Sequence, residues 1–486
     1  MDSGRHQRTA EALIPSTRDY KSKKVEIMSM KTNTQVASPP DPTVTRPELR
    51  RAAWSSWLGS SLEYMDFTLY TLASALVFGP LFFPNETPAV ALISSLGVYG
   101  SGFVVRPIGG YVFGRVGDKH GRRIVLIVTL SMMGIATMGI GLLPTYAQIG
   151  IWAPTLLVLL RLVQGFGAGA ELAGASVLLV ESSPVRRRGL FGAIVAMGTN
   201  SGIFLATVLW TLLTLLPDDA FLSWGWRVPF LLSIVTTFVA LAIRTKVKES
   251  PVFEEAKERR AEATANQVEQ PSILVEARQS AKSFLLALGI RMGENSAVYL
   301  VKGFMVGWVV TTTGLDSAVV TTGIMIGTVI GFATVPYFGK LSDKLGRRPV
   351  FLGFTLFQIL FAIPAMLLIE TGNPIVIAAV FAIFVGGPLP NLYGVESSWL
   401  VELFGSKHRY TFMTTIKEVG SVVSGGLAPV IAAALVAVIT DSWWPVAIVL
   451  ILFAGCGLLG ALFAPETRGR DLTTEVDAVD ESRALQ

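Results

Sequence analysis

Charged and polar side chains interrupt several long apolar stretches of this sequence, at spacings that bring them onto common faces if the stretches are helices. Positions three, four or seven residues apart lie on one side of a helix. A charge inside a membrane costs on the order of 3 kcal/mol unless it is paired or faces water, so a set of such charges indicates function. The acidic members are Glu63, Asp66, Glu171 and Glu294, and the others are Arg161, Arg291, Gln164 and Tyr70.

The acidic members could take up a proton within an apolar medium. Burial favours the neutral carboxyl group, whereas an adjacent arginine favours the charged one. A carboxylate whose arginine partner is drawn away by an anionic substrate would therefore be ready to bind a proton. The three histidines, His6, His120 and His408, lie outside the apolar stretches and cannot form a relay inside the membrane. We therefore predict that the proton-coupling residues are Glu63, Asp66, Glu171 and Glu294.

The arginines are suited to hold a substrate carboxylate, because a guanidinium group is always charged and can bind through two hydrogen bonds. At a rise of about 1.5 Å per residue, Asp66 lies about 18 Å and Arg161 about 21 Å from the same membrane face. The alternative is that the Asp66–Arg161 pair and Glu171 are static ties between helices. The predicted substrate-binding residues are Arg161, Arg291, Gln164 and Tyr70.

The composition indicates that a membrane surrounds these residues. Of 486 residues, 51% are hydrophobic and only 15% are charged, and the mean hydropathy is +0.55. Soluble proteins contain about 25% charged residues, so this chain is typical of a polytopic membrane protein. The single cysteine, Cys456, excludes an intrachain disulfide. Neither a Gly-rich phosphate loop, nor clustered metal ligands, nor a nucleophile motif stands out, so we expect neither an enzyme nor ATP-driven transport.

We predict an all-α fold with twelve membrane-spanning helices. A span needs roughly 20 mostly apolar residues, and twelve such stretches can be drawn. Most of the connections are short, which favours an up-and-down bundle. The spans lie near residues 54–78, 88–114, 124–144, 155–181, 189–216, 225–244, 283–310, 316–339, 349–369, 374–402, 411–438 and 443–464.

Lysine and arginine are concentrated in alternate loops, which fixes the expected orientation. The loops at 115–123, 184–189 and 340–348 and the segment at 405–410 are basic, whereas the intervening loops are mainly acidic. Basic loops stay in the cytoplasm. We therefore expect a multi-pass protein of the plasma (inner) membrane with both termini cytoplasmic. The net charge of +5 is then explained without nucleic acid as a partner.

One loop motif occurs twice, as GRVGDKHGRR at 114–123 and as GKLSDKLGRR at 339–348. Each copy follows the second span of its half, which indicates two similar six-span bundles that face each other across a pathway. Its aspartate can lie at a helix N-terminus or pair with an arginine, and thereby hold the cytoplasmic face together. The alternative is a loop that only sets topology. The predicted gate residues are Arg106, Gly114, Asp118, Arg122, Arg123, Asp343, Arg347 and Arg348.

The repeated loop resembles the signature of the major facilitator superfamily. Further segments make the sequence similar to the metabolite:proton symporter family, which includes permeases for organic acids and for proline or betaine. The resemblance covers about residues 50–470 and implies two pseudo-symmetric six-helix bundles. The segments are LEYMDFTLY at 62–70, RPIGG at 106–110, RLVQGFGAGAE at 161–171, ESSPVRRRG at 181–189, ESPVF at 249–253 and PETRG at 465–469.

The expected domain order follows from these elements. We expect a disordered cytoplasmic tail, a six-helix bundle, a charged cytoplasmic linker, a second six-helix bundle and a cytoplasmic C-terminal tail. Met28 and Met30 are alternative start residues to Met1. The boundaries are 1–50, 51–244, 245–282, 283–465 and 466–486.

We therefore predict a proton-coupled secondary transporter that imports a small carboxylate-bearing metabolite by alternating access. Its expected partners are this solute, protons and the lipid bilayer. We expect a monomer without a cofactor, with the proton gradient as the driving force. The alternatives are a proton symporter of a zwitterionic solute such as proline or betaine, an efflux antiporter and a non-transporting membrane sensor. The sequence leaves open the substrate, the proton stoichiometry and the carboxylate that binds the proton.

Overall fold

The computed structural model describes residues 44–86, 88–265, 278, 280–439 and 442–484, which form helices and loops with no strand among them. The predicted all-α fold is thus confirmed. The N-terminal predictions, disorder and alternative start residues, fall mainly on residues 1–43 and lie outside this described part.

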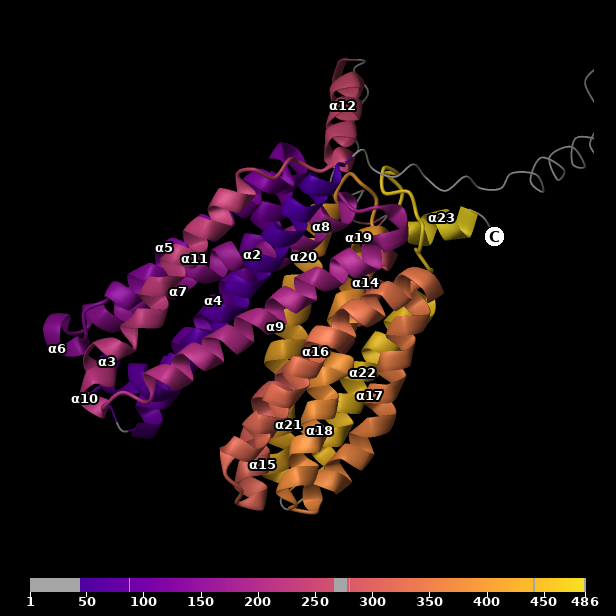
Figure 1. Ribbon diagram of the computed structural model, residues 1–486. Coiled ribbons are helices and arrows are strands. Elements are labelled where there is room, and N and C mark those ends of the chain that lie inside the picture. The colour runs from indigo at the N-terminus through magenta and orange to yellow at the C-terminus, as the bar shows by residue number, and fades with distance from the viewer. Residues whose placement is uncertain (1–43, 87, 266–277, 279, 440–441, 485–486) are drawn as a thin grey trace, which may run out of the picture. The chain divides into compact units, whose positions relative to one another are not determined.

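The helices form two halves, α2 to α11 and α14 to α22, with α12 between them in sequence and α23 at the C-terminal end (Figure 1). The first half contains α2 (Arg46–Ala73), α3 (Gly79–Phe82), α4 (Pro88–His120), α5 (Arg122–Leu142), α6 (Tyr146–Ile149), α7 (Trp152–Ala168), α8 (Glu171–Glu181), α9 (Arg188–Leu213), α10 (Asp218–Ala220) and α11 (Arg227–Arg244). The second contains α14 (Ala281–Tyr299), α15 (Met305–Thr313), α16 (Ser317–Leu345), α17 (Arg347–Glu370), α18 (Pro374–Gly386), α19 (Pro388–Leu403), α20 (Arg409–Gly420), α21 (Leu427–Val438) and α22 (Trp444–Phe463), and the flanking helices are α12 (Pro251–Ala265) and α23 (Ala478–Ala484).

The helices agree with the predicted spans. Within the described residues, 10 helices or helix runs are long and apolar enough to cross a membrane. They coincide with the third to the twelfth predicted spans, and α2 and α4 occupy the positions of the first two. The twelve predicted segments are therefore helical, and each is long enough to position side chains in the interior of a bilayer.

Local sequence signals set where several helices begin. Thr45 and Glu48 form a capping box at the start of α2, so this helix begins before the predicted boundary at residue 51. Asp316 caps α16 by accepting a hydrogen bond from the Ala318 N–H at 2.8 Å. Asn373 caps α18 in the same way. Such side chains satisfy backbone N–H groups that the helix itself leaves without partners.

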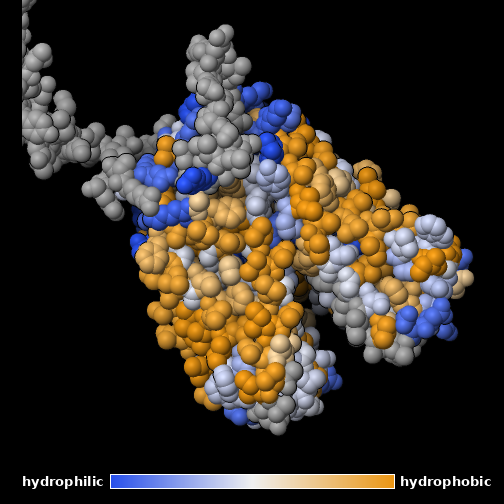
Figure 2. Space-filling model, turned by 180° about the vertical axis from the view of Figure 1, so that it is seen from behind, coloured by the Kyte–Doolittle hydropathy of each residue, from blue (hydrophilic) through white to orange (hydrophobic). Residues whose placement is uncertain are grey.

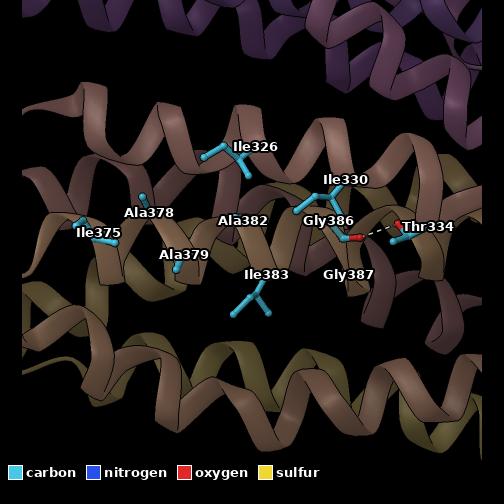
Figure 3. Close-up of a pocket in the computed structure, with 10 residues that line it drawn as sticks. All are labelled: Ile326, Ile330, Thr334, Ile375, Ala378, Ala379, Ala382, Ile383, Gly386 and Gly387. Atoms are coloured by element: carbon cyan, nitrogen blue, oxygen red, sulfur yellow. Dashed lines mark hydrogen bonds between the residues drawn. The ribbon is translucent and has the colours of Figure 1, made fainter.

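Four spans contain a π-helical turn, and two others, the fourth and the tenth, are each divided into two helices. The π turns cover Ser74–Phe78, Phe221–Gly225, Leu300–Phe304 and Ser421–Gly426. The tenth span breaks between α18 and α19 at Gly387, as its Gly-Gly-Pro sequence predicts. Figure 3 shows the groove at this break, where the Thr334 hydroxyl donates to the Gly386 carbonyl at 2.7 Å. This bond satisfies a backbone group that the broken helix would otherwise leave unpaired in lipid.

Glycines allow the helices within each half to approach closely. A Cβ on Gly202 of α9 would lie 2.1 Å from the Ser61 carbonyl oxygen of α2. A Cβ on Gly293 of α14 would lie 2.5 Å from the Gly457 Cα of α22. Because small residues leave no side chain between two crossing helices, the backbones come into direct contact. Helices in membranes usually pack in this way.

The outer surface of the helices is apolar. Large hydrophobic side chains such as Val104, Leu360 and Phe463 are more than half exposed. Figure 2 shows hydrophobic residues along the flanks of the helices and hydrophilic residues toward their ends. A soluble protein rarely exposes so wide an apolar surface, whereas lipid tails cover it without cost.

The C-terminal segment differs from the expected tail after residue 465. Leu472, Ala478 and Val479 are buried, and the Gly405 N–H donates to the Asp477 carboxylate at 2.9 Å. The Ser406 N–H donates to the Thr474 carbonyl at 2.8 Å. Apolar side chains spaced through this polar segment pack against α19 and its following loop, so residues 466–484 do not extend freely from the helices.

Candidate functional site

The two copies of the repeated loop hold the two halves together. We call the end of the helices that carries residues 114–123 and 339–348 the signature-loop end. Asp118 accepts hydrogen bonds from the N–H groups of Tyr410 at 3.3 Å and Thr411 at 2.8 Å, at the start of α20. Asp343 accepts from the N–H groups of Gly189 at 2.7 Å and Leu190 at 2.9 Å, at the start of α9. Each aspartate thus lies at a helix N-terminus of the opposite half, where the helix dipole stabilises a negative charge.

The second feature shared by the halves is a buried arginine–glutamate pair behind each loop. Arg122 contacts Glu181 at 3.3 Å, and Arg347 contacts Glu402 at 3.0 Å. A hydroxyl group completes each pair, since Ser250 donates to Glu181 at 2.5 Å and Thr467 donates to Glu402 at 2.8 Å. The two halves therefore repeat not only the loop but also the residues that hold it.

A third repeated feature caps the helix after each loop. Gly121 and Gly346 have φ values of 108° and 113°, which only glycine adopts readily. The turn that each glycine makes exposes the first N–H groups of α5 and α17. Glu249 accepts from the Arg123 N–H at 3.0 Å, and Glu466 accepts from the Arg347 and Arg348 N–H groups, each at 3.0 Å. The glutamates of the ESP and PET segments are thus helix caps within their own halves.

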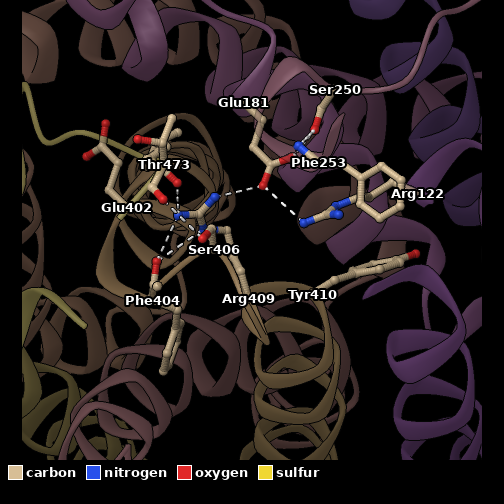
Figure 4. A network of polar contacts seen from close by, with 12 residues as sticks. Arg122, Glu181, Ser250, Phe253, Glu402, Phe404, Ser406, Arg409, Tyr410 and Thr473 are labelled. Carbon is tan, nitrogen blue, oxygen red and sulfur yellow. Dashed lines mark hydrogen bonds and ion pairs between the residues drawn. The ribbon is translucent and has the colours of Figure 1, made fainter. Parts of the chain in front are cut away.

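One ion pair of this network crosses between the halves. Figure 4 shows Glu181 of α8 between Arg122 of the first half and Arg409 of the second. The Arg409 Nη1 lies 2.7 Å from Glu181, and the same side chain donates to the Phe404 and Leu472 carbonyls. Arg409 is fully buried. The signature-loop end is therefore closed by charged groups that are themselves shielded from water.

The predicted gate residues divide into two groups. Arg106, Gly114, Asp118 and Asp343 contact the opposite half, whereas Arg122 and Arg347 lie against the aspartates and glutamates just described. Arg123 and Arg348 do not reach across. Arg123 donates to the Thr245 carbonyl and Arg348 to the Leu462 carbonyl, both within their own halves. Arg123 and Arg348 occupy equivalent positions in the two copies of the motif because each donates to a backbone carbonyl near the end of another helix. Neither bond joins the two halves.

Deeper in the protein, Arg106 joins the two halves. Its guanidinium group contacts Glu63 of α2 at 3.0 Å and Glu418 of α20 at 2.6 Å and 3.0 Å. Glu63 and Glu418 are at most 3% exposed. Glu63, a predicted proton-coupling residue, is thus part of a three-member ion cluster between the halves. Glu418 lies in the eleventh span, and its partner could not be identified from the sequence.

Asp66 and Arg161 are connected through Gln164. Asp66 accepts hydrogen bonds from the Thr137 hydroxyl at 2.7 Å and from the Gln164 amide at 3.4 Å. The Arg161 Nη1 donates to the Gln164 carbonyl oxygen at 2.5 Å. All four side chains are at most 5% exposed. The structure thus brings the predicted trio together, with the amide between the acid and the base, and adds Thr137 to it.

Aromatic rings surround this trio. The Arg161 guanidinium lies 4.4 Å from the Tyr70 ring centroid and 5.0 Å from that of Phe67. Phe67 also lies 4.8 Å from the Arg106 guanidinium, so one ring contacts both arginines. Phe103 packs against Phe67 at 5.4 Å and reaches Tyr299 of the second half at 6.2 Å. Tyr70 is fully buried in the first half, and Phe67 is a neighbour that the charge pattern did not reveal.

Glu171 forms a closed pair with Arg244. Their atoms are 2.7 Å apart, both side chains are fully buried, and the Thr129 hydroxyl donates to Glu171 at 2.9 Å. Arg244 also donates to the Leu126 carbonyl at 2.9 Å. This geometry agrees with the static-tie alternative for Glu171. Arg244 ends the sixth predicted span, where a basic residue is expected for orientation alone, so the sequence did not identify it as the partner.

Arg291 of α14 is the centre of a cluster in the second half. Its Nη1 lies 2.5 Å from Glu294 and 3.4 Å from Glu396 of α19, and its Nη2 donates to the Ser421 hydroxyl at 3.0 Å. The predicted Arg291–Glu294 pair is therefore present. Lys417 of α20, which is 1% exposed, lies beside it with its Nζ 3.4 Å from the Tyr393 hydroxyl. Lys417 and Glu396 are not among the predicted site residues, because neither has a charged residue three, four or seven positions away in its own span.

Within the described residues, no group of three or more His, Cys, Asp or Glu side chains is placed to hold a metal ion. The buried acids described above instead contact arginine and hydroxyl groups.

Comparison with known proteins decides the family. The family model "Sugar (and other) transporter" matches residues 82–477. The chain belongs to this transporter family. The shikimate transporter of Escherichia coli (strain K12) is 36% identical over 436 residues, which are 89% of this chain and 98% of that protein. The proline/betaine transporter of Salmonella typhimurium (strain LT2) is 34% identical over 434 residues, 87% of this chain and 85% of that protein.

A solved structure shows the same fold. The proton:xylose symporter XylE of the major facilitator superfamily, bound to 6-bromo-6-deoxy-D-glucose, is similar with a TM-score of 0.69 at 17% identity, over 89% of this chain and 99% of that one. Membership in the major facilitator superfamily and its fold are thereby confirmed. The chain is a multi-pass membrane transporter of a small molecule, and not an enzyme.

Proposed function

We propose that this transporter is a proton-coupled symporter of a small carboxylate-bearing metabolite. The observation that carries the proposal is the position of Gln164 between Asp66 and Arg161. The amide oxygen accepts from the arginine and the amide nitrogen donates to the aspartate. A substrate carboxylate that binds Arg161 competes with Gln164 for the guanidinium group, because it offers two charged oxygens to a planar donor.

Proton binding follows from the same contacts. When Gln164 turns toward a new partner, Asp66 keeps the Thr137 hydroxyl as donor but loses the amide and the nearby positive charge. A buried carboxylate without these partners is stabilised by a proton. Anion binding at Arg161 and protonation of Asp66 thus favour each other. Entry of the anion with at least one proton keeps the loaded site close to neutral, which lowers the cost of moving it through the membrane.

Alternating access requires that the two halves close at one end and open at the other. We propose that the signature-loop end is the cytoplasmic gate, with Asp118 and Asp343 as the groups that release the opposing helices. Both termini then lie in the cytoplasm, and the protein resides in the plasma (inner) membrane. A single chain contains both halves of the pathway, so we propose that the monomer transports with no cofactor, driven by the proton gradient.

Import of a zwitterion such as proline or betaine is the second candidate. The similarity to the Salmonella proline/betaine transporter favours it. A zwitterion also carries a carboxylate for Arg161, but it needs a place for its cationic group. The rings of Phe67 and Tyr70 suit a cation, although Arg161 already lies against both. A solute without a positive charge leaves that contact unchanged.

The proposal is tested by uptake into proteoliposomes. Labelled shikimate and labelled proline are offered separately, with and without an inward proton gradient. We expect shikimate or a related acid to accumulate only with the gradient. Asp66→Asn should lose uphill accumulation and keep exchange, whereas Asp316→Asn, the same change at an exposed helix cap, should behave as wild type. Accumulation that is insensitive to an uncoupler would exclude proton symport.

A further inference from the structure

Two buried carboxylates share one arginine in the second half. The Arg291 Nη1 contacts Glu294 at 2.5 Å and Glu396 at 3.4 Å. Arg291, Glu294 and Glu396 are at most 4% exposed. The other carboxylate oxygen of Glu396, Oε1, has no hydrogen-bond partner. One guanidinium group therefore serves two acids, and the contact to Glu396 is the weaker one.

The charges around this pair do not balance. The ion cluster at Arg106 and the cluster at Arg291 lie on adjacent helices, and Lys417 is close enough to interact with Glu294, Glu396 and Glu418. The acids are Glu63, Glu418, Glu294 and Glu396, and the bases are Arg106, Arg291 and Lys417, each at most 5% exposed. If all seven of these buried groups were ionised, they would carry one net negative charge, and the further base that interacts with Glu294, Lys302, is only partly buried. Removing such a charge from water costs several kcal/mol, so a bound proton is the more stable arrangement.

The other predicted intramembrane acids, Glu171 and Asp66, lie outside this network. Glu171 has Arg244 at 2.7 Å and a hydroxyl donor besides. Asp66 has two hydrogen-bond donors, with Arg161 behind one of them. The excess acid therefore belongs to the network that joins the halves.

Within that network, the glutamates beside Arg291 are less completely hydrogen-bonded to a positive group than those beside Arg106. Arg106 makes three hydrogen bonds of 2.6–3.0 Å to Glu63 and Glu418. Arg291 makes one short bond to Glu294 and a long one to Glu396, and its Nε has no hydrogen-bond partner. Lys417 contacts a tyrosine and no carboxylate at ion-pair distance.

We infer that Glu294 and Glu396 together hold one exchangeable proton, and that this pair is the proton-binding site of the second half. The inference rests on the proposed proton symport and extends it from Asp66 to a second position. The proton belongs to the pair, because two acids on one base titrate as a unit. The proton forms an O–H bond on one carboxylate, while the other carboxylate stays ionised and pairs with Arg291. The titratable and charged groups that interact with the pair are Arg291, Lys302, Lys417, Tyr64 and Tyr393. Glu418, Glu63 and Arg106 lie next to these groups and not against the pair itself.

This pair of glutamates is separate from the proposed binding site of the substrate carboxylate at Arg161. Arg161 and Asp66 belong to α7 and α2 of the first half, whereas Glu294 and Glu396 belong to α14 and α19 of the second. The Arg106–Glu418 contact lies between them and must break when the halves separate. Protonation of the second-half pair removes a negative charge from the network that this contact holds together.

Infrared difference spectroscopy tests the inference without a substrate. Purified protein in liposomes is compared between acidic and alkaline pH, and the C=O stretching band of a protonated buried carboxyl group is followed. We expect this band in wild type, and its loss in both Glu294→Gln and Glu396→Gln, because the remaining acid is then matched by Arg291. Asp316→Asn, at an exposed helix cap, should keep it. A band that keeps its full wild-type intensity in either of the two variants, or is absent from wild type, overturns the inference.

Two further measurements keep the outcome clear. The Asp variants Glu294→Asp and Glu396→Asp retain the acid and should keep the band, which separates loss of a proton site from loss of folding. In shikimate uptake, the Gln variants should lower the accumulation ratio to about one while counterflow stays within about threefold of wild type. If wild type accumulates no carboxylate at all, the proposed symport fails, and the infrared result still decides whether the pair binds a proton.

Discussion

Adding one methyl group at Gly114 should open the signature-loop end. A Cβ at this position would lie 2.5 Å from the Thr414 hydroxyl oxygen and 2.8 Å from the Thr411 Cα of the opposite half. The hydroxyl can rotate away, but the Thr411 Cα is backbone and cannot. Gly114→Ala therefore penalises only the conformation in which α4 and α20 are in contact, and leaves the open conformation unaffected.

The size of the effect follows from this overlap. Overpacking by a methyl group costs about 1–3 kcal/mol. Because the cost falls on one of two conformations, the equilibrium shifts toward the open one by about 5- to 150-fold. If the closed conformation predominates in wild type, the rate of any reaction that needs the open conformation should rise by the same factor.

Cysteine labelling measures this shift. The single native cysteine is removed by Cys456→Ser, and Ser398→Cys then reports on the interface, since Ser398 is fully buried and lies against Gly192 of the first half. A membrane-impermeant maleimide is applied to the signature-loop face. Gly97→Ala is the matched control, because Gly97 lies in the same helix with open space around it. Labelling of the Gly114→Ala protein at the wild-type rate would refute the proposed closed contact.

Three other changes have defined outcomes. Asp343→Asn removes the charge that faces two N–H groups of α9, so labelling of the same cysteine reporter should rise about 5- to 30-fold for a loss of about 1–2 kcal/mol. Glu171→Gln leaves Arg244 buried without its ion partner and should lower the unfolding free energy by about 3–5 kcal/mol; a change below about 1 kcal/mol in denaturant titration would show that the pair is not the tie described. Burial raises the pKa of the Glu249 carboxyl, so its ionisation opposes folding and the stability should fall as pH rises from the ordinary pKa of glutamate to the raised one. Glu249→Gln should flatten this part of the stability-against-pH curve, and an unchanged slope would assign it to another group.

The architecture could be predicted from the sequence because each signal is local. The length of the apolar stretches predicts the spans, and the repeated loop motif predicts the two halves. Asp118 and Asp343 were expected either at a helix N-terminus or beside an arginine, and each has both neighbours. The sequence did not show that each helix belongs to the opposite half, because that contact depends on how the two halves pack.

The ion pairs were predictable only where they are close in sequence. Arg291 and Glu294 are three residues apart, and they pair. Arg106 with Glu418, and Glu171 with Arg244, join distant spans, and depth in the membrane alone did not select them. Lys417 and Glu396 were not included in the predicted site, since the other charge in each span is not at helical spacing from them. Burial and distance in the folded chain identify them.

The central claim, that substrate and proton move together, is tested most directly by following the proton. Proteoliposomes that contain the transporter and an entrapped pH dye are given an inward gradient of shikimate and no proton gradient. Coupled symport predicts that the interior acidifies as the substrate enters, and that Asp66→Asn abolishes the acidification. Entry of the substrate without any change of internal pH would contradict the claim.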